Sequence, residues 1–199
     1  MCEDCGAQDG IGGNVGLGRS IMAENMTGGP AVPKARGLHH FAWRCREAEE
    51  TRHFYEDLLG LPLVHIITAD NVPSTGEHSP YLHLFFGMAD GSCIAFFDLG
   101  DGQAAEPSPN TPAWVNHFAM ELGSRDELLT MQARLQAAGI DVIGVTDHGF
   151  VNSIYFFDPN GLRLEYTVRT VGPEVEAAYA QEAHAALQRW KDRSKRARG

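Results

Sequence analysis

The chain has 199 residues, of which 43% are hydrophobic and 21% are charged, and its formal net charge is −10. This composition is that of an ordinary folded protein with one sizeable core, or with two small halves packed closely together. The acidic balance argues against nucleic acid as a partner, because neutralising phosphates requires a basic surface. No apolar run approaches the ~18 residues of a membrane span, and the N-terminus lacks the basic and apolar regions of a secretion signal. We therefore expect a cytoplasmic protein with no membrane partner.

Residues 1–36 contain many glycines and show little hydrophobic periodicity. We expect a flexible N-terminal extension here. Cys2 and Cys5 form a CxxC pair, but a zinc site needs about two more ligands and none lies nearby. We interpret this pair as reduced thiols.

A first structural unit is predicted over residues 37–100. Its opening run, LHHFAWRC, suits a buried strand, and the run EAEETRHFYEDLL has helical spacing and ends at Gly60. Three further strands are expected in LPLVHII, PYLHLFFGM and SCIAFFDLG, with a turn-rich stretch, DNVPSTGEHSP, after the first of them. A linker rich in proline and small residues follows at 100–113.

A second unit is predicted over residues 114–169, with the same order of elements. A strand at VNHFAMEL precedes a helix in SRDELLTMQARLQAA, which ends at Gly139. The strands IDVIGV, SIYFF and LRLEYTV follow, and the last two are joined by the tetrapeptide DPNG, which suits a type I turn.

The two units are copies of one another. The motif His-Phe-Ala at 40–42 returns at 117–119, and an Asp-Gly pair opens SCIAFF just as an Asn-Gly pair opens LRLEYT. On that register Ala95 stands where Glu165 stands in the second copy. The chain therefore reads as an α+β protein built from two strand–helix–strands modules.

The repeat places His40, His117 and Glu165 where all three can face one cavity, because side chains alternate across a strand. Two imidazoles and one carboxylate leave about three coordination positions of a metal open, as in non-haem Fe(II) oxygenases. The metal is therefore predicted to be divalent, Fe(II) first and Mn(II) as the alternative. The neighbouring His39 is excluded, because the second copy has Asn116 there and because strand alternation points His39 the other way.

The runs LHHFAWRCREAEETRHFYEDLLGLPL, VNHFAMEL and SIYFFDPNGLRLEYT resemble the vicinal oxygen chelate superfamily, which includes glyoxalases, bleomycin resistance proteins and extradiol dioxygenases. The resemblance covers about 37–169. It implies paired βαβββ modules that form a curved mixed sheet around a divalent metal. The superfamily's four possible ligand positions correspond to His40, Ala95, His117 and Glu165.

The resemblance is strongest to the small, single-domain extradiol dioxygenases, which use His, His and Glu as ligands. It implies a ring-cleaving reaction on a catechol-like aromatic substrate with O₂, and a tyrosine ten residues before the glutamate, here Tyr155. Two-domain members carry a catalytic histidine about fifteen residues before their second ligand histidine, where this chain has Gly102. His148 and His83 are candidates to replace that histidine. We predict Tyr155 and His148 as the catalytic pair.

Two other functions remain open. A metal-dependent isomerase, epimerase or lyase of the glyoxalase type would act through an enediolate, although glyoxalase I fills all four ligand positions and Ala95 leaves one empty. A small-molecule-binding resistance protein is the other possibility, although such proteins generally lack the metal ligands. Arg44 and Arg163 alternate with apolar residues on their strands, and we expect both to face solvent.

The C-terminal segment, 170–199, is predicted to hold a helix over about 173–192 and a solvated basic tail. Pro173 suits a helix start. An apolar stripe then recurs at helical spacing, in Val175, Tyr179, Ala183, Leu187 and Trp190. The stripe suits packing on its own domain or on a second subunit, and we expect a homo-oligomer.

Overall fold

The computed structural model describes the backbone of residues 31–198 and the side chains of residues 31–194. The chain divides into a unit over 1–36 and a unit over 37–199, and the second holds every helix and strand of the described residues. Most of the expected N-terminal extension, with Cys2 and Cys5, lies outside the described residues. No helix in the described part of the chain is long and apolar enough to cross a membrane.

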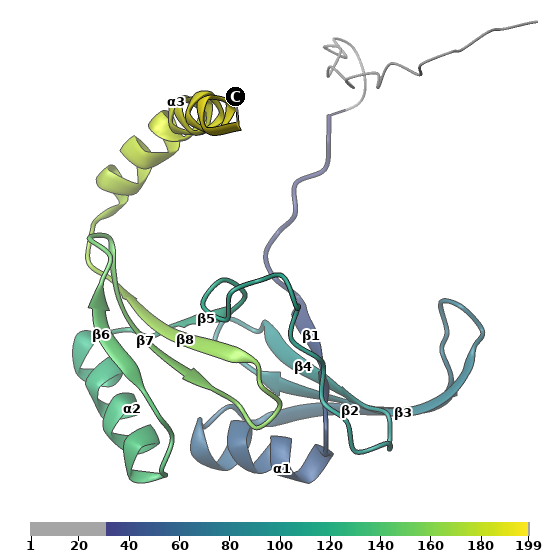
Figure 1. The fold of residues 1–199 in the computed structure, drawn as a ribbon. Coiled ribbons are helices and arrows are strands. Elements are labelled where there is room, and N and C mark those ends of the chain that lie inside the picture. The colour runs from purple at the N-terminus through teal and green to yellow at the C-terminus, as the bar shows by residue number, and fades with distance from the viewer. Residues whose placement is uncertain (1–30, 199) are drawn as a thin grey trace, which may run out of the picture. The chain divides into compact units, whose positions relative to one another are not determined.

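Two modules follow one another along the chain (Figure 1). The first comprises β1 (His40–Cys45), α1 (Ala48–Arg52) with its π-helical continuation η1 (His53–Leu58), β2 (Leu63–Asn71), β3 (His78–Gly87) and β4 (Cys93–Asp98). The second comprises β5 (Phe118–Glu121), α2 (Arg125–Ala137), β6 (Ile143–Asp147), β7 (Val151–Phe157) and β8 (Arg163–Arg169). The final helix, α3, spans Pro173–Arg198.

Each module forms a four-stranded sheet of the same topology. The strand orders are β1-β4-β3-β2 and β5-β8-β7-β6, and β1/β4 and β5/β8 are the parallel pairs. Both α1 and α2 lie on the lower side of the sheets in Figure 1. The predicted α+β class with paired βαβββ modules is confirmed.

Three elements are longer than the sequence pattern indicated. Strands β2 and β3 continue into the turn-rich stretch and pair as far as Asn71 and His78, because cross-strand pairing extends through its polar residues. Helix α3 continues six residues past the expected end at 192 and reaches Arg198. Its basic tail is therefore helical, since nothing in that segment breaks a helix.

Local chemistry sets the helix ends. The Ser124 hydroxyl accepts the Glu127 backbone N–H at 3.2 Å, which caps the start of α2. Glu47 caps α1 by accepting the N–H groups of Glu49 and Glu50. Gly60, which follows the first helix, has a φ of 77°, in the left-handed region that favours glycine.

The space between the sheets and the helices is filled by one apolar core that includes residues of both modules. The Tyr55 ring is fully buried and lies 4.8 Å from Phe96 and 5.2 Å from Phe86, measured between ring centroids. Phe54 reaches across to Phe156 of the second module at 6.4 Å. The apolar residues of β4 and β8 thus face the helices, so their alternating neighbours face the other side.

The turn between β7 and β8 joins the modules. Asp158 accepts the buried Tyr55 hydroxyl at 3.0 Å, and its other oxygen accepts the N–H groups of Asn160 and Leu162 at 2.9 and 2.8 Å. The Asn160 side chain in turn accepts the Arg46 N–H at 2.9 Å. These bonds hold the second module's turn on the first module's helix, which sets how the two sheets meet.

Candidate metal centre

His117 and Glu165 meet on the face of the second sheet that points away from α2. Glu165 of β8 is the register partner of Ala119, two residues after His117. His117 Nε2 lies 3.0 Å from Glu165 Oε2. His117 Nδ1 lies 2.9 Å from the Val115 carbonyl oxygen, so a proton on Nδ1 can be donated there while Nε2 is the nitrogen directed at Glu165.

The Glu165 carboxylate is buried, with 6% of the residue exposed. Its second oxygen accepts the Ser153 hydroxyl at 2.5 Å, and Ser153 also contacts Thr167 at 3.1 Å. A histidine oriented by a backbone carbonyl beside a carboxylate oriented by a hydroxyl is the arrangement that metal ligands commonly show. This donor pair therefore fits a divalent metal.

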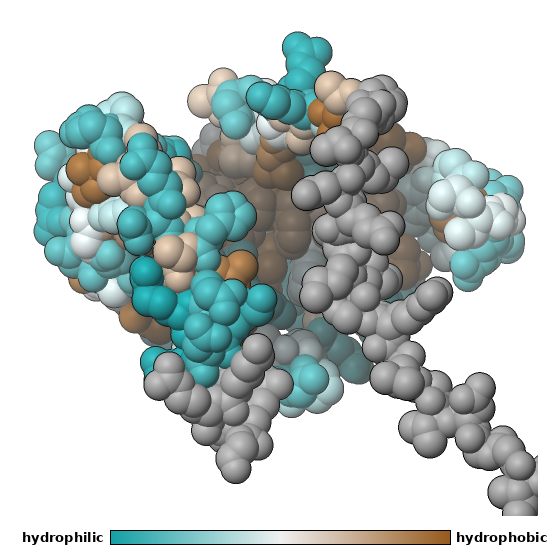
Figure 2. Space-filling model, turned by 90° about the horizontal axis from the view of Figure 1, so that it is seen from above, coloured by the Kyte–Doolittle hydropathy of each residue, from teal (hydrophilic) through white to brown (hydrophobic). Residues whose placement is uncertain are grey.

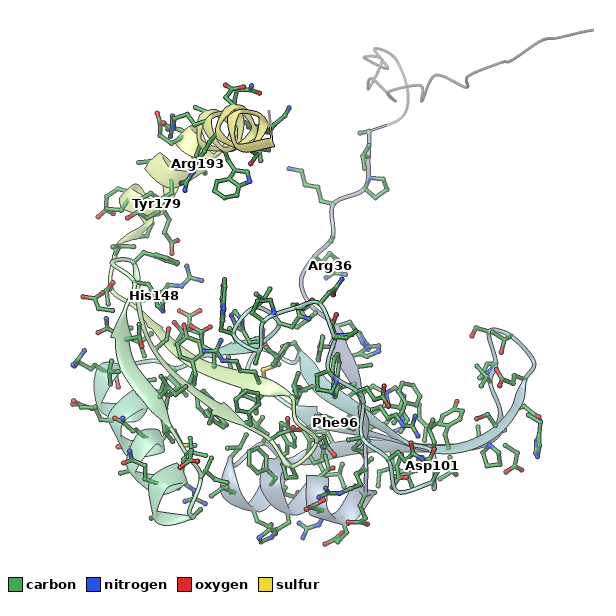
Figure 3. The ribbon with its side chains drawn as sticks, viewed as in Figure 1. Arg36, Phe96, Asp101, His148, Tyr179 and Arg193 are labelled. Atoms are coloured by element: carbon green, nitrogen blue, oxygen red, sulfur yellow. The ribbon has the colours of Figure 1, made fainter. Side chains whose placement is uncertain are left out.

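Tyr155 and His148 lie beside this pair. Tyr155 of β7 is the register partner of Glu165, and its ring lies 6.1 Å from that of His117. Its hydroxyl lies 2.7 Å from His148 Nε2, at the β6–β7 turn (Figure 3). Burial raises the pKa of Tyr155, and the nearby Glu165 charge adds to this. The phenol is thus protonated at neutral pH.

Arg163 was expected to face solvent, and this prediction was wrong. Its guanidinium lies over the Tyr155 ring, 4.2 Å from the centroid, and donates to the Trp114 carbonyl at 2.5 Å. Arg163 shares a sheet face with Glu165, two positions away on β8, so strand alternation was the signal that could have placed it. Ser153 and Tyr155 are likewise two positions apart on β7, so they share one face of the sheet.

His40 lies at the start of β1, on the first sheet. Its Nδ1 is 2.7 Å from His39 Nδ1, and its ring is 6.0 Å from His83 and 5.4 Å from Phe85. His39 does not point the other way as alternation predicted, because β1 begins only at His40 and His39 lies outside the strand. Within the described residues, no three His, Cys, Asp or Glu side chains converge in a way that could hold a metal.

The strands that carry the two histidines nevertheless begin next to each other. Phe41 and Phe118, the residues that follow His40 and His117, stack with their ring centroids 5.0 Å apart. Both rings belong to the layer on the helix side. His40, within β1, alternates to the opposite face of that strand. His117 directly precedes β5 and reaches Glu165 on β8. The structure thus joins His117, Glu165, Tyr155 and His148 directly and places His40 on the adjoining strand.

The fourth ligand position of the repeat holds Ala95. Ala95 pairs with Ala42 as Glu165 pairs with Ala119, so the two positions are equivalent, as the repeat predicted. Ala95 is completely buried. No carboxylate from the first module can enter the site at this position.

Aromatic rings cover the rest of this face of the first sheet. His83 stacks on Phe97 at 3.7 Å and lies 4.2 Å from Phe85. Only 6% of His83 is exposed, and its Nε2 has no hydrogen-bond partner within the described residues. Burial lowers the pKa of His83 to about 4, so the ring is neutral at pH 7. Seen from above, the middle of the molecule is hollowed, and its floor is largely hydrophobic (Figure 2).

The family model of the Glyoxalase/Bleomycin resistance protein/Dioxygenase superfamily matches residues 37–166. The chain belongs to this superfamily. Its membership agrees with the βαβββ repeat. A search of curated protein sequences found no significant match.

Solved structures share the fold at low identity. A glyoxylase/bleomycin resistance protein/dioxygenase domain from Frankia is 16% identical, covers 68% of this chain and 99% of its own, and has a TM-score of 0.55. Another is a mutant of the fosfomycin resistance protein FosX from Listeria monocytogenes, complexed with Mn(II) and a dihydroxypropylphosphonic acid. It is 19% identical, covers 72% of this chain and 99% of its own, and has a TM-score of 0.51. The lactoylglutathione lyase of Agrobacterium tumefaciens is 20% identical, covers 68% of this chain and 96% of its own, and has a TM-score of 0.48.

Proposed function

We propose that this superfamily member is an Fe(II)-dependent, extradiol-type dioxygenase that cleaves the ring of a catechol-like substrate with O₂. His40, His117 and Glu165 are the proposed ligands, and Mn(II) is the alternative metal. The observation that carries the proposal is the oriented His117–Glu165 pair beside Tyr155, with Ala95 at the fourth ligand position. Three protein ligands leave room for a chelating substrate and O₂ together.

For this site to form, the His40 imidazole must leave its contact with His39 and turn toward His117 and Glu165. Its imidazole contacts His39, while the Phe41–Phe118 stack keeps the starts of β1 and β5 together. Turning the ring away from His39 would also change its edge contacts with Phe85 and His83, at 5.4 and 6.0 Å between ring centroids. Fe(II), when bound, would supply positions for both substrate hydroxyls and for O₂.

Tyr155 and His148 are the proposed acid–base pair. The protonated Tyr155 hydroxyl is placed to hydrogen-bond a substrate oxygen beside Glu165, and His148 Nε2 at 2.7 Å is placed to accept or return a proton. The Arg163 guanidinium covers the Tyr155 ring, with its Cζ 4.2 Å from the ring centroid. This pair takes the place of the histidine that is missing at Gly102.

The first sheet supports an aromatic substrate. The rings of Phe85, Phe97 and His83 lie on the same face as Ala95, because His83 pairs with Phe97 and Phe85 pairs with Ala95 across the strands. Aromatic rings prefer offset or edge contacts with other rings, which favours a planar ring as the ligand.

Oxygen uptake tests the proposal. The protein, purified without oxygen and loaded with Fe(II), should consume about one O₂ per catechol and give a coloured ring-fission product. The matched control is Glu165→Gln, which keeps the size of the side chain but weakens it as a ligand. Loaded protein that takes up no oxygen across a broad catechol panel would overturn the dioxygenase proposal.

The second candidate is a metal-dependent isomerase, epimerase or lyase. The Tyr155–His148 contact favours it, because such a pair can move a proton on a metal-bound substrate without O₂. Substrate conversion under strictly anaerobic conditions would identify this class. A pure binding protein would instead show tight ligand binding with neither conversion nor metal dependence.

A further inference from the structure

Helix α3 stands clear of the sheets, as Figure 1 shows. It leaves the end of β8 and runs from Pro173 to Arg198. Near its start, the Tyr179 ring makes an edge contact with Phe150 of the β6–β7 turn, at 6.3 Å between ring centroids, and the larger part of its surface stays open to solvent. Tyr179 is 52% exposed, Leu187 57% and Trp190 60%. Tyr179 and Arg193 project from it in Figure 3. Exposed apolar side chains aligned on one helix mark an interaction surface.

The exposed face has the spacing of a coiled-coil seam. Six positions recur at alternating intervals of three and four residues, which is the a/d pattern of two-stranded helix pairs. These seam residues are Glu176, Tyr179, Ala183, Ala186, Trp190 and Arg193. The two central alanines permit close approach of a second helix.

Two copies of the seam are complementary in charge and in side-chain size when the two helices run antiparallel. In an antiparallel pair centred between residues 184 and 185, each a position faces a d position of the partner helix. Glu176 then faces Arg193, Tyr179 faces Trp190, and Ala183 faces Ala186, each pair occurring twice. Charge meets opposite charge at both ends, and small residues meet in the middle.

The flanking charges agree with the same register. Glu182 and Arg189 lie beside the seam, and in the antiparallel pair each faces the other residue of the second helix. Within one chain these two residues are 3.7 Å apart and well exposed, so they can turn to a partner without leaving a buried charge. A parallel pair would instead place Glu176 against Glu176 and Arg193 against Arg193.

We propose that α3 is a self-association surface, on which a second copy of this chain docks its own α3 in antiparallel orientation. Existing contacts are compatible with this arrangement. Glu176 contacts Arg169 through one carboxylate oxygen and keeps the other free, and Arg193 lies over the Trp190 ring at 5.4 Å. The arginine thus helps to cover the aromatic that the partner's tyrosine meets.

The available area suits a specific contact. The 18-residue seam is about 27 Å long. Aromatic side chains bury roughly 150–250 Å² each, so four half-exposed rings supply on the order of 400 Å². Leu187, the alanines and the stems of the charged residues add to this toward the ~1,000 Å² of a specific interface.

Charge exchange tests both the interface and its direction. Light scattering after size exclusion should show a dimer for the full-length chain at micromolar concentration. Glu176→Arg alone and Arg193→Glu alone should each raise the dimer dissociation constant at least about tenfold, because like charges then meet twice. Mixing these two variants should restore the dimer, since each mutated residue then faces an opposite charge.

Two variants outside the seam are the matched controls. Glu174→Arg and Lys191→Glu make the same charge changes at positions outside the seam and should leave the dissociation constant unchanged. A monomeric wild-type chain would overturn the proposal, as would single seam variants that dimerise as well as these controls. Single variants that become monomers but do not pair when mixed would overturn the antiparallel register.

Discussion

Ala95 and Glu165 occupy one position in two sheets of the same topology. Each pairs with the alanine of its module's His-Phe-Ala motif, and each has an aromatic residue as its other neighbour, Phe85 or Tyr155. With a methyl group in one module and a carboxylate in the other, the proposed metal would have three protein ligands rather than four. The open position is what the proposed oxygen chemistry requires.

Ala95→Glu should therefore suppress O₂ uptake while the protein still binds metal. The added carboxylate would take a coordination position that substrate or O₂ needs. An electrode measurement of O₂ uptake beside metal analysis checks this. Ala95→Gln has the same size and is a weaker ligand, so it separates ligation from crowding at this buried position. An isomerase or lyase should tolerate Ala95→Glu better.

His117→Ala and His40→Ala should each abolish stoichiometric metal binding while circular dichroism shows a folded protein. Both side chains lie at strand starts near solvent, so water can fill the space they leave. Titration calorimetry with Mn(II) measures the affinity without any activity. His39→Ala is the control and should bind normally. Loss of metal in His39→Ala but not in His40→Ala would show that the wrong histidine of the pair was chosen.

Tyr155→Phe should keep both metal and substrate but slow turnover by ~10²-fold or more, the range for one positioned acid–base group. The change removes only the hydroxyl that contacts His148 at 2.7 Å. His148→Gln should slow the same step, and the double variant should be no slower than the worse single variant, because the two act as one unit. Additive losses would mean independent roles.

Tyr55→Phe should lower the free energy of unfolding by about 1–3 kcal/mol, the usual cost of losing a buried hydrogen bond to a carboxylate. The Tyr55–Asp158 bond at 3.0 Å links the two modules. Chemical denaturation of Tyr55→Phe, Asp158→Asn and the double variant isolates the coupling energy. Tyr81→Phe, at a tyrosine without a hydrogen bond among the described contacts, should change stability little. A coupling energy near zero would mean that other contacts hold the modules together.

The buried His83 should make the protein acid-sensitive. Its pKa falls from 6.5 to about 4, so between these values the unfolded chain binds a proton that the folded protein does not. The free energy of unfolding should therefore drop as the pH falls from about 6.5 to 4, by up to about 1.4 kcal/mol per unit. Denaturation of wild type and His83→Phe at several pH values checks this. The difference in the free energy of unfolding between the two proteins should be constant above pH 6.5. If this free energy fell equally steeply with pH in both proteins below pH 6.5, the prediction would be wrong.

The repeat is what the sequence by itself determined. The spacing of His-Phe-Ala, of the two Gly-terminated helices and of the Asp-Gly and Asn-Gly turns predicted both modules and the equivalence of Ala95 with Glu165. These features follow from local rules, namely strand alternation, helix periodicity and turn residues, which a single chain displays without its partners. Tyr155, by contrast, was singled out through the family resemblance.

Only the tertiary structure decided which side chains meet. Strand alternation shows which side of a sheet Arg163 and His83 occupy, but their neighbours depend on register and on packing between strands. The direction of the His39 side chain depended on the residue at which β1 begins. The contact between the modules depended on Asp158 accepting a hydrogen bond from a helix about a hundred residues earlier in the chain. Such contacts are non-local, so their residues are separated too far for any local pattern to predict them.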